Sequence, residues 1–226
     1  MGRRVADLTN QTFAHPISLV SASRGSVPRF LRQVLVGSCP QPFTFPEHPD
    51  HCSWGGRYDP AEGLYTNVTD SVTGLDGTVH RTNQATVWRW RAAFQNDFAA
   101  RINWTLTSSR TEANHPAVSV LNGTAGEAPA YIQVRSGDAV PLSAAGSNDP
   151  DHDPLHYRWW QYAEADGGRR GDPVITLDRP TEQAIRIVAP DVKEERRFHI
   201  ILEVTDAGTP PLTRYRRAIV MVSPRQ

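Results

Sequence analysis

Three carboxylates at alternate positions of one short segment are the first candidates for chemistry. Asp149, Asp151 and Asp153 lie in a run that also holds proline, asparagine and histidine. Carboxylate oxygens suit Ca²⁺, but the run has neither the glycine at the sixth position nor the glutamate at the twelfth position of an EF-hand loop. We interpret the run as a tight turn capped by aspartate side chains, with a structural calcium site as the alternative.

The same aspartates are poor candidates for catalysis. Acids that break glycosyl bonds need a buried position, such as the end of a parallel strand, where burial and neighbouring charges adjust their pKa values. Here the run follows residues 142–147, which we expect to be the edge of a strand entering a loop. We assign no catalytic residue, and we expect no cofactor apart from the calcium alternative.

Two cysteines and two histidines upstream offer the sulfur and nitrogen ligands that zinc binds. Cys39, His48, His51 and Cys52 match no standard zinc-finger spacing, so we expect the histidines to be ordinary loop residues. The two cysteines would close one disulfide in an oxidising compartment and remain free thiols in a reducing one. The sequence leaves both states open.

An aromatic pair beside an arginine is the third candidate. Arg158, Trp160 and Tyr162 share one face of a predicted strand. Exposed rings on a flat sheet can stack on the apolar faces of sugars, and exposed apolar area generally marks an interface. Three interpretations stay open: contact with another part of the protein, such as the segment from Trp88 to Trp104; contact with a glycan; and packing in a second layer.

Charge, hydropathy and missing motifs exclude several functions. The chain has 24 basic and 24 acidic residues, so no overall field attracts nucleic acid or an anionic membrane. The mean hydropathy is −0.48, and no stretch approaches the roughly 18 consecutive apolar residues of a membrane span. The sequence contains no Ser-His-Asp arrangement, P-loop, G-x-G-x-x-G or H-E-x-x-H motif. We therefore expect no nucleic-acid partner and no membrane partner.

Downstream of Pro116 the hydrophobic pattern has a period of two. The predicted strands are residues 118–121, 131–135, 139–143, 155–162, 174–177, 184–188, 198–205 and 214–222, separated by turn-forming clusters. Seven or eight short strands over about 110 residues are typical of an immunoglobulin-like β-sandwich. The predicted fold class is mainly β: a C-terminal immunoglobulin-like antiparallel β-sandwich, preceded by a loop-rich segment with one aromatic helix.

Alternation along these strands assigns the core of the sandwich. Residues that share the inward face are apolar, whereas their neighbours are mixed. The predicted core residues are Tyr157, Trp159, Ile185, Ile187, Phe198, Ile200, Leu202 and Val204.

The upstream part is irregular except for one helix. Residues 38–60 hold five prolines, which favours an extended, loop-rich stretch. Trp90, Phe94, Phe98 and Ile102 recur every four residues, which predicts a helix over about 86–104 with a wide apolar face. Such a face must be buried against something, and residues 1–85 offer no strong partner for it.

Asparagines in N-x-S/T sequons give some support for passage through a secretory pathway. The sequons begin at Asn10, Asn67, Asn103 and Asn122, and the last three are our candidate glycosylation sites. The first ten residues lack the apolar segment of a signal peptide. We therefore expect that the start of the chain is missing.

Several motifs together resemble a known family. In chain order they are Ser53–Tyr58, Trp88–Arg101, Trp104, Glu112–Pro116, Gly146–Asp151 and Leu155–Tyr162. This pattern is similar to the C-terminal part of the cellulose-binding, nucleoside-hydrolase-like proteins, and the resemblance covers roughly residues 50–223.

The resemblance implies two domains and a carbohydrate-related, extracellular role. Residues 1–114 would be an incomplete remnant of the nucleoside-hydrolase-like domain, whose aspartate cluster would lie upstream of the chain, and residues 115–226 would be the immunoglobulin-like domain. Trp54 and Arg57 then join the aromatic strand as candidates for carbohydrate or domain contact. We expect a non-catalytic module that binds cellulose or another polysaccharide, or docks a hydrolase-like domain. The alternative is a truncated hydrolase that acts on glycosyl bonds.

Overall fold

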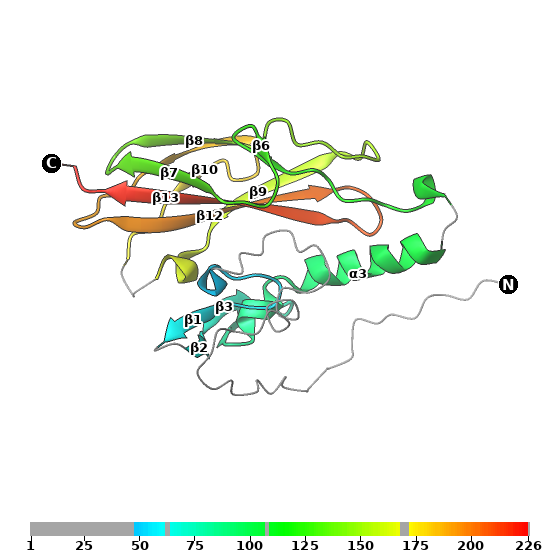
Figure 1. Cartoon of the computed structure of the whole chain (residues 1–226), viewed down its shortest axis with the longest axis horizontal. Helices are drawn as coiled ribbons and strands as arrows, with labels where there is room; N and C mark the ends of the chain where they lie inside the picture. The colour runs from blue at the N-terminus through cyan, green and yellow to red at the C-terminus, as the bar shows by residue number, and fades with distance from the viewer. Residues whose placement is uncertain (1–47, 62–63, 107–108, 168–171, 226) are drawn as a thin grey trace.

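The structure is a computed structural model that describes residues 48–61, 64–106, 109–167 and 172–225. It is mainly β, as the sequence predicts, and Figure 1 shows a sandwich of strands with a smaller group of hairpins and helices below it. The larger sheet has the order β7 (Ala130–Arg135), β13 (Thr213–Ser223), β12 (Arg196–Asp206) and β9 (Leu155–Gln161). The smaller sheet has the order β10 (Leu177–Asp178), β11 (Ala184–Val188) and β8 (Ala139–Ser143). A short hairpin of β5 (Val120–Leu121) and β6 (Thr124–Ala125) lies beside them.

One strand pairing differs from the prediction of a purely antiparallel sandwich. β13 pairs antiparallel with β12 but parallel with β7, with Ile219 opposite Tyr131. β7 and β8 lie in different sheets, and β7, the first strand of the larger sheet along the chain, runs in the same direction as β13, the last one. Period-two alternation fixes which face a side chain occupies but carries no information on strand direction.

The core lies between the two sheets and follows the predicted alternation. Trp159 is 2% exposed, whereas its neighbour Trp160 is half-buried on the opposite face. The predicted residues of β9, β11 and β12 all belong to this cluster, with Tyr157 partly buried at its margin. The register that we derived from the sequence is therefore confirmed.

The upstream part is more ordered than the loop-rich prediction. Two hairpins, β1 (Tyr58–Ala61) with β2 (Leu64–Asn67) and β3 (Asp70–Thr73) with β4 (Val79–Thr82), precede the helices α2 (Ala85–Trp88) and α3 (Arg91–Leu106). Three single-turn 3₁₀ helices complete the described elements: η1 (Pro49–His51), η2 (Arg110–Glu112) and η3 (Ala163–Asp166). The hairpin strands are four residues long and mostly polar, so they are too short to show a clear hydrophobic alternation in the sequence.

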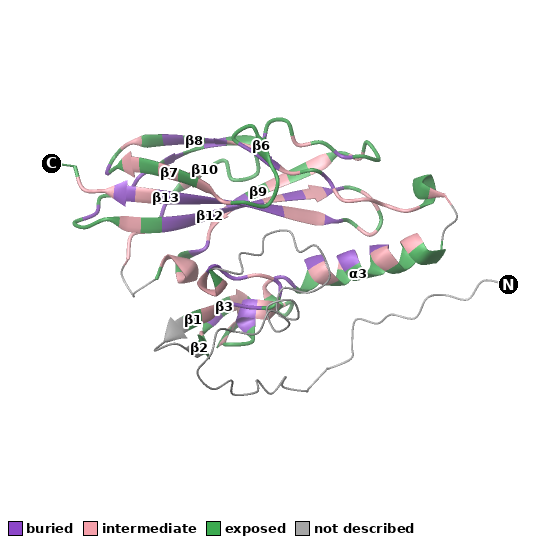
Figure 2. Ribbon diagram, in the orientation of Figure 1, coloured by how far each residue is buried: buried purple, intermediate pink, exposed green. Residues whose placement is uncertain are grey.

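The helix is present, and the predicted apolar stripe is buried only in its first half: Trp90 is 1% exposed and Phe94 packs against a buried aromatic cluster. Along α3 the buried residues are Ala93, Asp97 and Ala100, whereas Phe98 is 67% exposed and Ile102 is 44% exposed. In Figure 2 the buried residues of α3 face the sandwich and the exposed ones face away from it. Beyond its first turn α3 therefore buries small and polar side chains, while its two later apolar residues remain exposed.

A second apolar cluster joins the upstream part to the sandwich. Its buried members come from both parts of the chain: Cys52, Trp54, Trp90, Ala93, Tyr162, Ile201 and Tyr215. It covers the outer face of β9, β12 and the start of β13, so this part of the larger sheet is packed on both sides.

Candidate functional site

The aromatic face of β9 lies under the upstream part of the chain. The guanidinium of Arg89 lies 4.4 Å from the ring centre of Tyr162 and 5.2 Å from that of Trp160. Trp90 packs against the same two rings, with centroids 6.1 Å and 5.8 Å apart. Cation–π contacts of this kind are strongest where water is excluded, as it is here. The geometry is that of a contact between two parts of one chain.

Asp70, on β3, is the polar centre of this contact. Its Oδ1 accepts hydrogen bonds from Nε and Nη2 of Arg57 at 3.0 and 2.6 Å. Its Oδ2 accepts a hydrogen bond from the Tyr162 hydroxyl and lies 3.6 Å from Arg89. Burial raises the pKa of Tyr162, so the hydroxyl stays protonated and continues to donate. Losing one partner of a buried pair like Asp70 and Arg57 typically costs about 3–5 kcal/mol.

A buried arginine makes a second polar connection. Arg217, on β13, is fully buried; it donates one hydrogen bond to Nδ1 of His199 at 2.7 Å and another to the backbone carbonyl of His51. The acceptor role of Nδ1 leaves the proton of this neutral imidazole on Nε2. Burial, reinforced by the charge of Arg217, lowers the pKa of His199 to about 2 and that of His51 to about 3. Both histidines are therefore neutral throughout the physiological range.

Asp166, at the end of η3, is an acid of this region whose pKa is strongly raised. It accepts the backbone N–H of His199 at 2.5 Å and the side-chain amide of Gln161 at 2.7 Å. Burial raises its pKa to about 7, although the two hydrogen bonds and Arg217 act in the opposite direction.

Four of the five predicted contact residues lie in or beside the buried contact. Trp54 and Arg57 are less than 10% exposed, Tyr162 is fully buried and Trp160 is half-buried. Arg158 lies at the rim, where its exposed side chain pairs with Glu203 at 3.3 Å. These rings offer no flat, free platform for a sugar.

The acidic run forms a turn that its own side chains cap. Oδ1 of Asp149 accepts the backbone N–H groups of Asp151 and Asp153 at 2.8 and 3.2 Å. The carboxylate of Asp151 lies 3.1 Å from Nδ1 of His115 and accepts its backbone N–H. Two of the three acids therefore have protein partners that account for their positions, and calcium binding stays a hypothesis.

The remaining sequence candidates are exposed or only partly described. Asn67, Asn103 and Asn122 are all exposed. Cys52 is a buried free thiol whose sulfur accepts a hydrogen bond from the Trp90 indole at 3.3 Å. Cys39 lies outside the described residues, so the structure does not test a disulfide between Cys39 and Cys52.

A free polar and aromatic row lies on the same sheet, along the edge strand β7. Ala130, Ile132 and Val134 pack on the core, so the alternate residues Tyr131, Gln133 and Arg135 face outward. All three are exposed, and Tyr131 retains 58% of its accessible surface. Alternate residues of a strand are about 6.7 Å apart, so the row spans roughly 13 Å.

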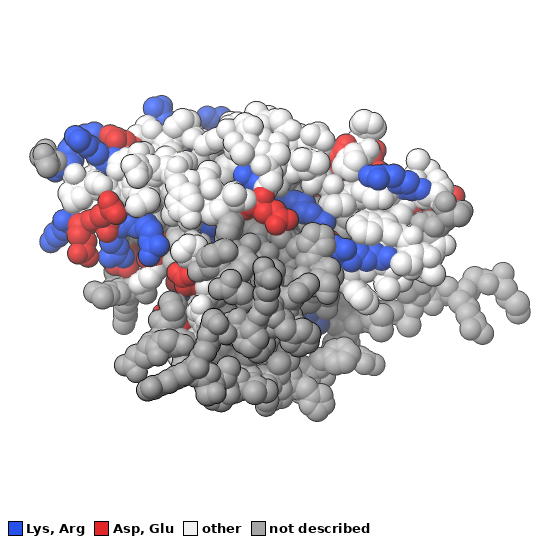
Figure 3. Space-filling view, in the orientation of Figure 1, with Lys and Arg blue, Asp and Glu red and all other residues white. Residues whose placement is uncertain are grey.

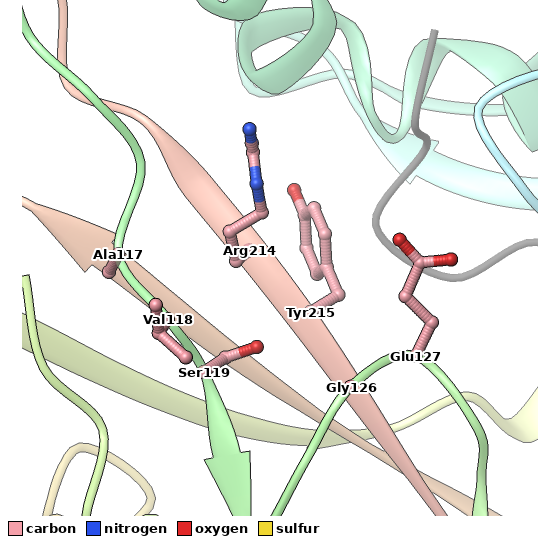
Figure 4. Close-up of a pocket in the computed structure, with 7 residues that line it drawn as sticks. All are labelled: Ala117, Val118, Ser119, Gly126, Glu127, Arg214 and Tyr215. Atoms are coloured by element: carbon pink, nitrogen blue, oxygen red, sulfur yellow. The ribbon is translucent and has the colours of Figure 1, made fainter.

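A small pocket lies between the β5–β6 hairpin and the start of β13. Figure 4 shows Arg214, Tyr215 and Glu127 rising on the same side of this pocket. Its volume of about 160 Å³ is well below the roughly 300–1,000 Å³ of typical ligand sites. Arg214 is already bound to Asp97 of α3 at 3.0 Å, so its charge is not available to a ligand.

Charges of both signs are mixed on the visible part of the described surface. On the face in Figure 3, acidic and basic side chains lie close together at several places. Among the helices that the structure describes, none is long and apolar enough to cross a membrane.

The C-terminal sandwich is similar to a domain of a carbohydrate-related protein. Residues 139–222 match the family model described as the C-terminal domain of the cellulose-binding protein Sde0182. The resemblance that we inferred from the sequence motifs is thereby confirmed.

A solved structure extends the likeness over both parts of the chain. It is described as a nucleoside hydrolase-related hypothetical protein from Saccharophagus degradans that is associated with carbohydrate metabolism. The likeness has a TM-score of 0.66 at 29% sequence identity and covers 80% of this chain but 44% of the other. The present chain thus spans less than half of that protein.

More distant solved structures give weaker likenesses. They include a PKD domain from the KIAA 1837 protein, at 15% identity, a TM-score of 0.32, and coverage of 46% of this chain and 95% of the other. A Photobacterium 2,6-sialyltransferase gives 9% identity, a TM-score of 0.31, and coverage of 43% and 18%. No curated protein matches the chain.

Sequence reasoning missed the polar residues that hold the contact together. Asp70 and Arg217 carry its buried charges and Asp166 lies partly buried beside them, and none of the three belongs to a recognisable motif. The sequence did contain one indication. Tyr215, Arg217 and Ile219 alternate along the same face of β13, so a charged residue stands between an aromatic and an aliphatic one. A charge in such a row predicts a covered face with a buried polar partner.

Proposed function

We propose that this chain is a non-catalytic, polysaccharide-associated module in which the aromatic face of β9 is a docking surface. The observation that carries the proposal is the burial of Trp160 and Tyr162 under Arg89 and Trp90. Rings that stack on crystalline glycan have to be exposed, whereas these are closed in by their own chain. The sandwich therefore uses this face to hold the upstream segment in place.

We further propose that the row formed by Tyr131, Gln133 and Arg135 contacts the polysaccharide. A tyrosine ring offers an apolar face to a sugar, while the amide and the planar guanidinium offer donors to its hydroxyl groups. The family of cellulose-binding domains matched by residues 139–222 supports this choice of partner. A partner of this kind and the three exposed sequons are consistent with a secreted protein.

Retention on insoluble polysaccharide tests the glycan surface. The full chain should be retained weakly on cellulose, in the micromolar to millimolar range expected for a small contact area. Tyr131→Ala should lower retention several-fold. Tyr65→Ala removes a comparably exposed tyrosine of β2 and is the matched control, with no change expected. Equal retention of the two variants would contradict the assignment of the row.

The alternative function is hydrolysis of glycosyl bonds by this chain. The likeness to a nucleoside hydrolase-related protein favours testing it. We expect no release of base or aryl group from nucleosides or aryl glycosides above buffer, because the acidic run lies in a capped turn. Turnover that disappears in Asp151→Asn would contradict the non-catalytic assignment.

A further inference from the structure

Three side chains with metal-binding atoms come together at η1. His48, Asp50 and His51 each offer one ligand atom, and these atoms lie within 4.8 Å of one another. Nδ1 of His48 is 3.8 Å from Oδ1 of Asp50, and Nε2 of His51 is 3.9 Å from Oδ2. Ligand atoms around tetrahedral zinc are roughly 3.4 Å apart at bond lengths of about 2.0–2.1 Å. The two imidazole planes are nearly parallel, so the exposed His48 ring has to turn out of the stack to bring all three atoms onto one ion.

The backbone holds this group together through local structure. Pro49 fixes the first φ angle of the turn, and the His51 N–H donates to the His48 carbonyl at 3.0 Å. In a 3₁₀ turn, side chains three residues apart lie on the same side. The two imidazole rings are accordingly stacked, with centroids 4.5 Å apart and planes 9° from parallel. The hydrogen bond from Arg217 to the His51 carbonyl anchors the turn to the sandwich.

We propose that His48, Asp50 and His51 form an open binding site for a zinc ion, with water completing the coordination. Two imidazoles and one carboxylate are a ligand set that zinc accepts. The nearby thiol is not part of it, because the sulfur of Cys52 lies against the Thr86 carbonyl and the Trp90 indole instead.

Charge makes Asp50 the decisive ligand of this site. The positive groups near His51 are Arg217 and Arg197, and both disfavour a cation. The carboxylate of Asp50 is the negative group within reach of both imidazoles, so its neutralisation should weaken zinc binding at least as much as loss of one histidine. Only three protein ligands are available, and we therefore expect a micromolar dissociation constant. The proposal is independent of polysaccharide binding.

Calorimetric titration of the chelator-treated full chain with zinc chloride tests the site. We expect one equivalent to bind, and we expect His48→Ala and Asp50→Asn each to weaken binding at least tenfold. Asp76 and His80 form an exposed pair 4.0 Å apart on the neighbouring hairpin without a third ligand, so His80→Ala is the matched control. It should leave the affinity unchanged. Circular dichroism of each variant checks that the fold is retained.

A cobalt titration separates this ligand set from a thiolate site. Cobalt bound by imidazole and carboxylate shows visible d–d bands without a sulfur-to-cobalt charge-transfer band. The proposal is overturned if zinc does not bind, if His80→Ala weakens binding as much as His48→Ala does, or if the charge-transfer band appears.

Discussion

At the scale of residues, charged and titratable groups are placed where water is absent. Asp70, Arg57 and Tyr162 satisfy one another directly, and Arg217 is satisfied by His199 and a backbone carbonyl. Such groups gain little net stability over apolar ones, but they tolerate only one arrangement of partners. We interpret them as the device that fixes the orientation of the upstream segment on the sheet.

The buried histidines predict a defined response to acid. His199 and His51 have pKa values of about 2 and about 3 in the folded chain, against 6.5 when unfolded, so unfolding takes up two protons as the pH falls below 6.5. Asp166 acts in the opposite direction, because its raised pKa of about 7 means that the folded chain holds one more proton between pH 4 and 7. The two histidines together outweigh Asp166, so stability falls from pH 6.5 towards 4, and the raised pKa of the buried Glu203 makes this loss smaller.

Urea denaturation across this pH range measures the effect. His199→Gln keeps an acceptor for Arg217 and removes one titrating histidine, so the loss of stability between pH 6.5 and 4 should be smaller than in the original chain. His156→Gln, at an exposed position, should keep the slope of the original chain. A wild-type stability that does not change from pH 6.5 to 4 would show that these histidines are not held neutral by burial.

At the scale of elements, the sequence predicts the sandwich far better than the segment that covers it. The boundaries of β8 and β11 agree with the predicted ranges, and those of β9, β12 and β13 differ by one or two residues. The inward residues of these strands all pack into the core between the two sheets, so apolar residues recur at every second position of the sequence. The hairpins of residues 58–82 bury little of their own surface, and their positions depend on a sheet that is distant in sequence. The sequence identifies Trp160 and Tyr162 as contact residues. It does not identify Arg89 and Trp90 as the residues that cover them.

Helix α3 gives a direct test of which face is packed. Phe98→Ala should change the free energy of unfolding by no more than about 0.5 kcal/mol, because the ring is largely exposed. Ala100→Leu, two residues along the same helix, should cost about 1–3 kcal/mol. Ala100 is 1% exposed, so the larger leucine side chain has no free space at this position. Thermal or urea unfolding of the two variants compares them directly. A larger loss for Phe98→Ala would mean that the apolar stripe, and not the small residues, faces the sheet.

At the scale of the whole molecule, the upstream part covers the outer face of β9, β12 and the start of β13. Expressed without the upstream part, residues 115–226 would expose Tyr162, Ile201 and Tyr215, which are buried in the complete chain. We expect this fragment to self-associate, as measured by light scattering. Substituting Trp160 and Tyr162 by alanine together should make it more soluble. A monomeric, well-behaved fragment would contradict the docking role of this face.

The parallel pairing of β7 with β13 has a mechanical consequence. These are the first and last strands of the larger sheet along the chain, and they run in the same direction over six paired residues. A force that pulls the two ends of the sandwich apart acts along both strands in opposite senses, so it loads their hydrogen bonds in shear and all of them at once. An antiparallel hairpin pulled at its open end would instead lose its bonds one by one. We therefore expect the sandwich to resist stretching strongly.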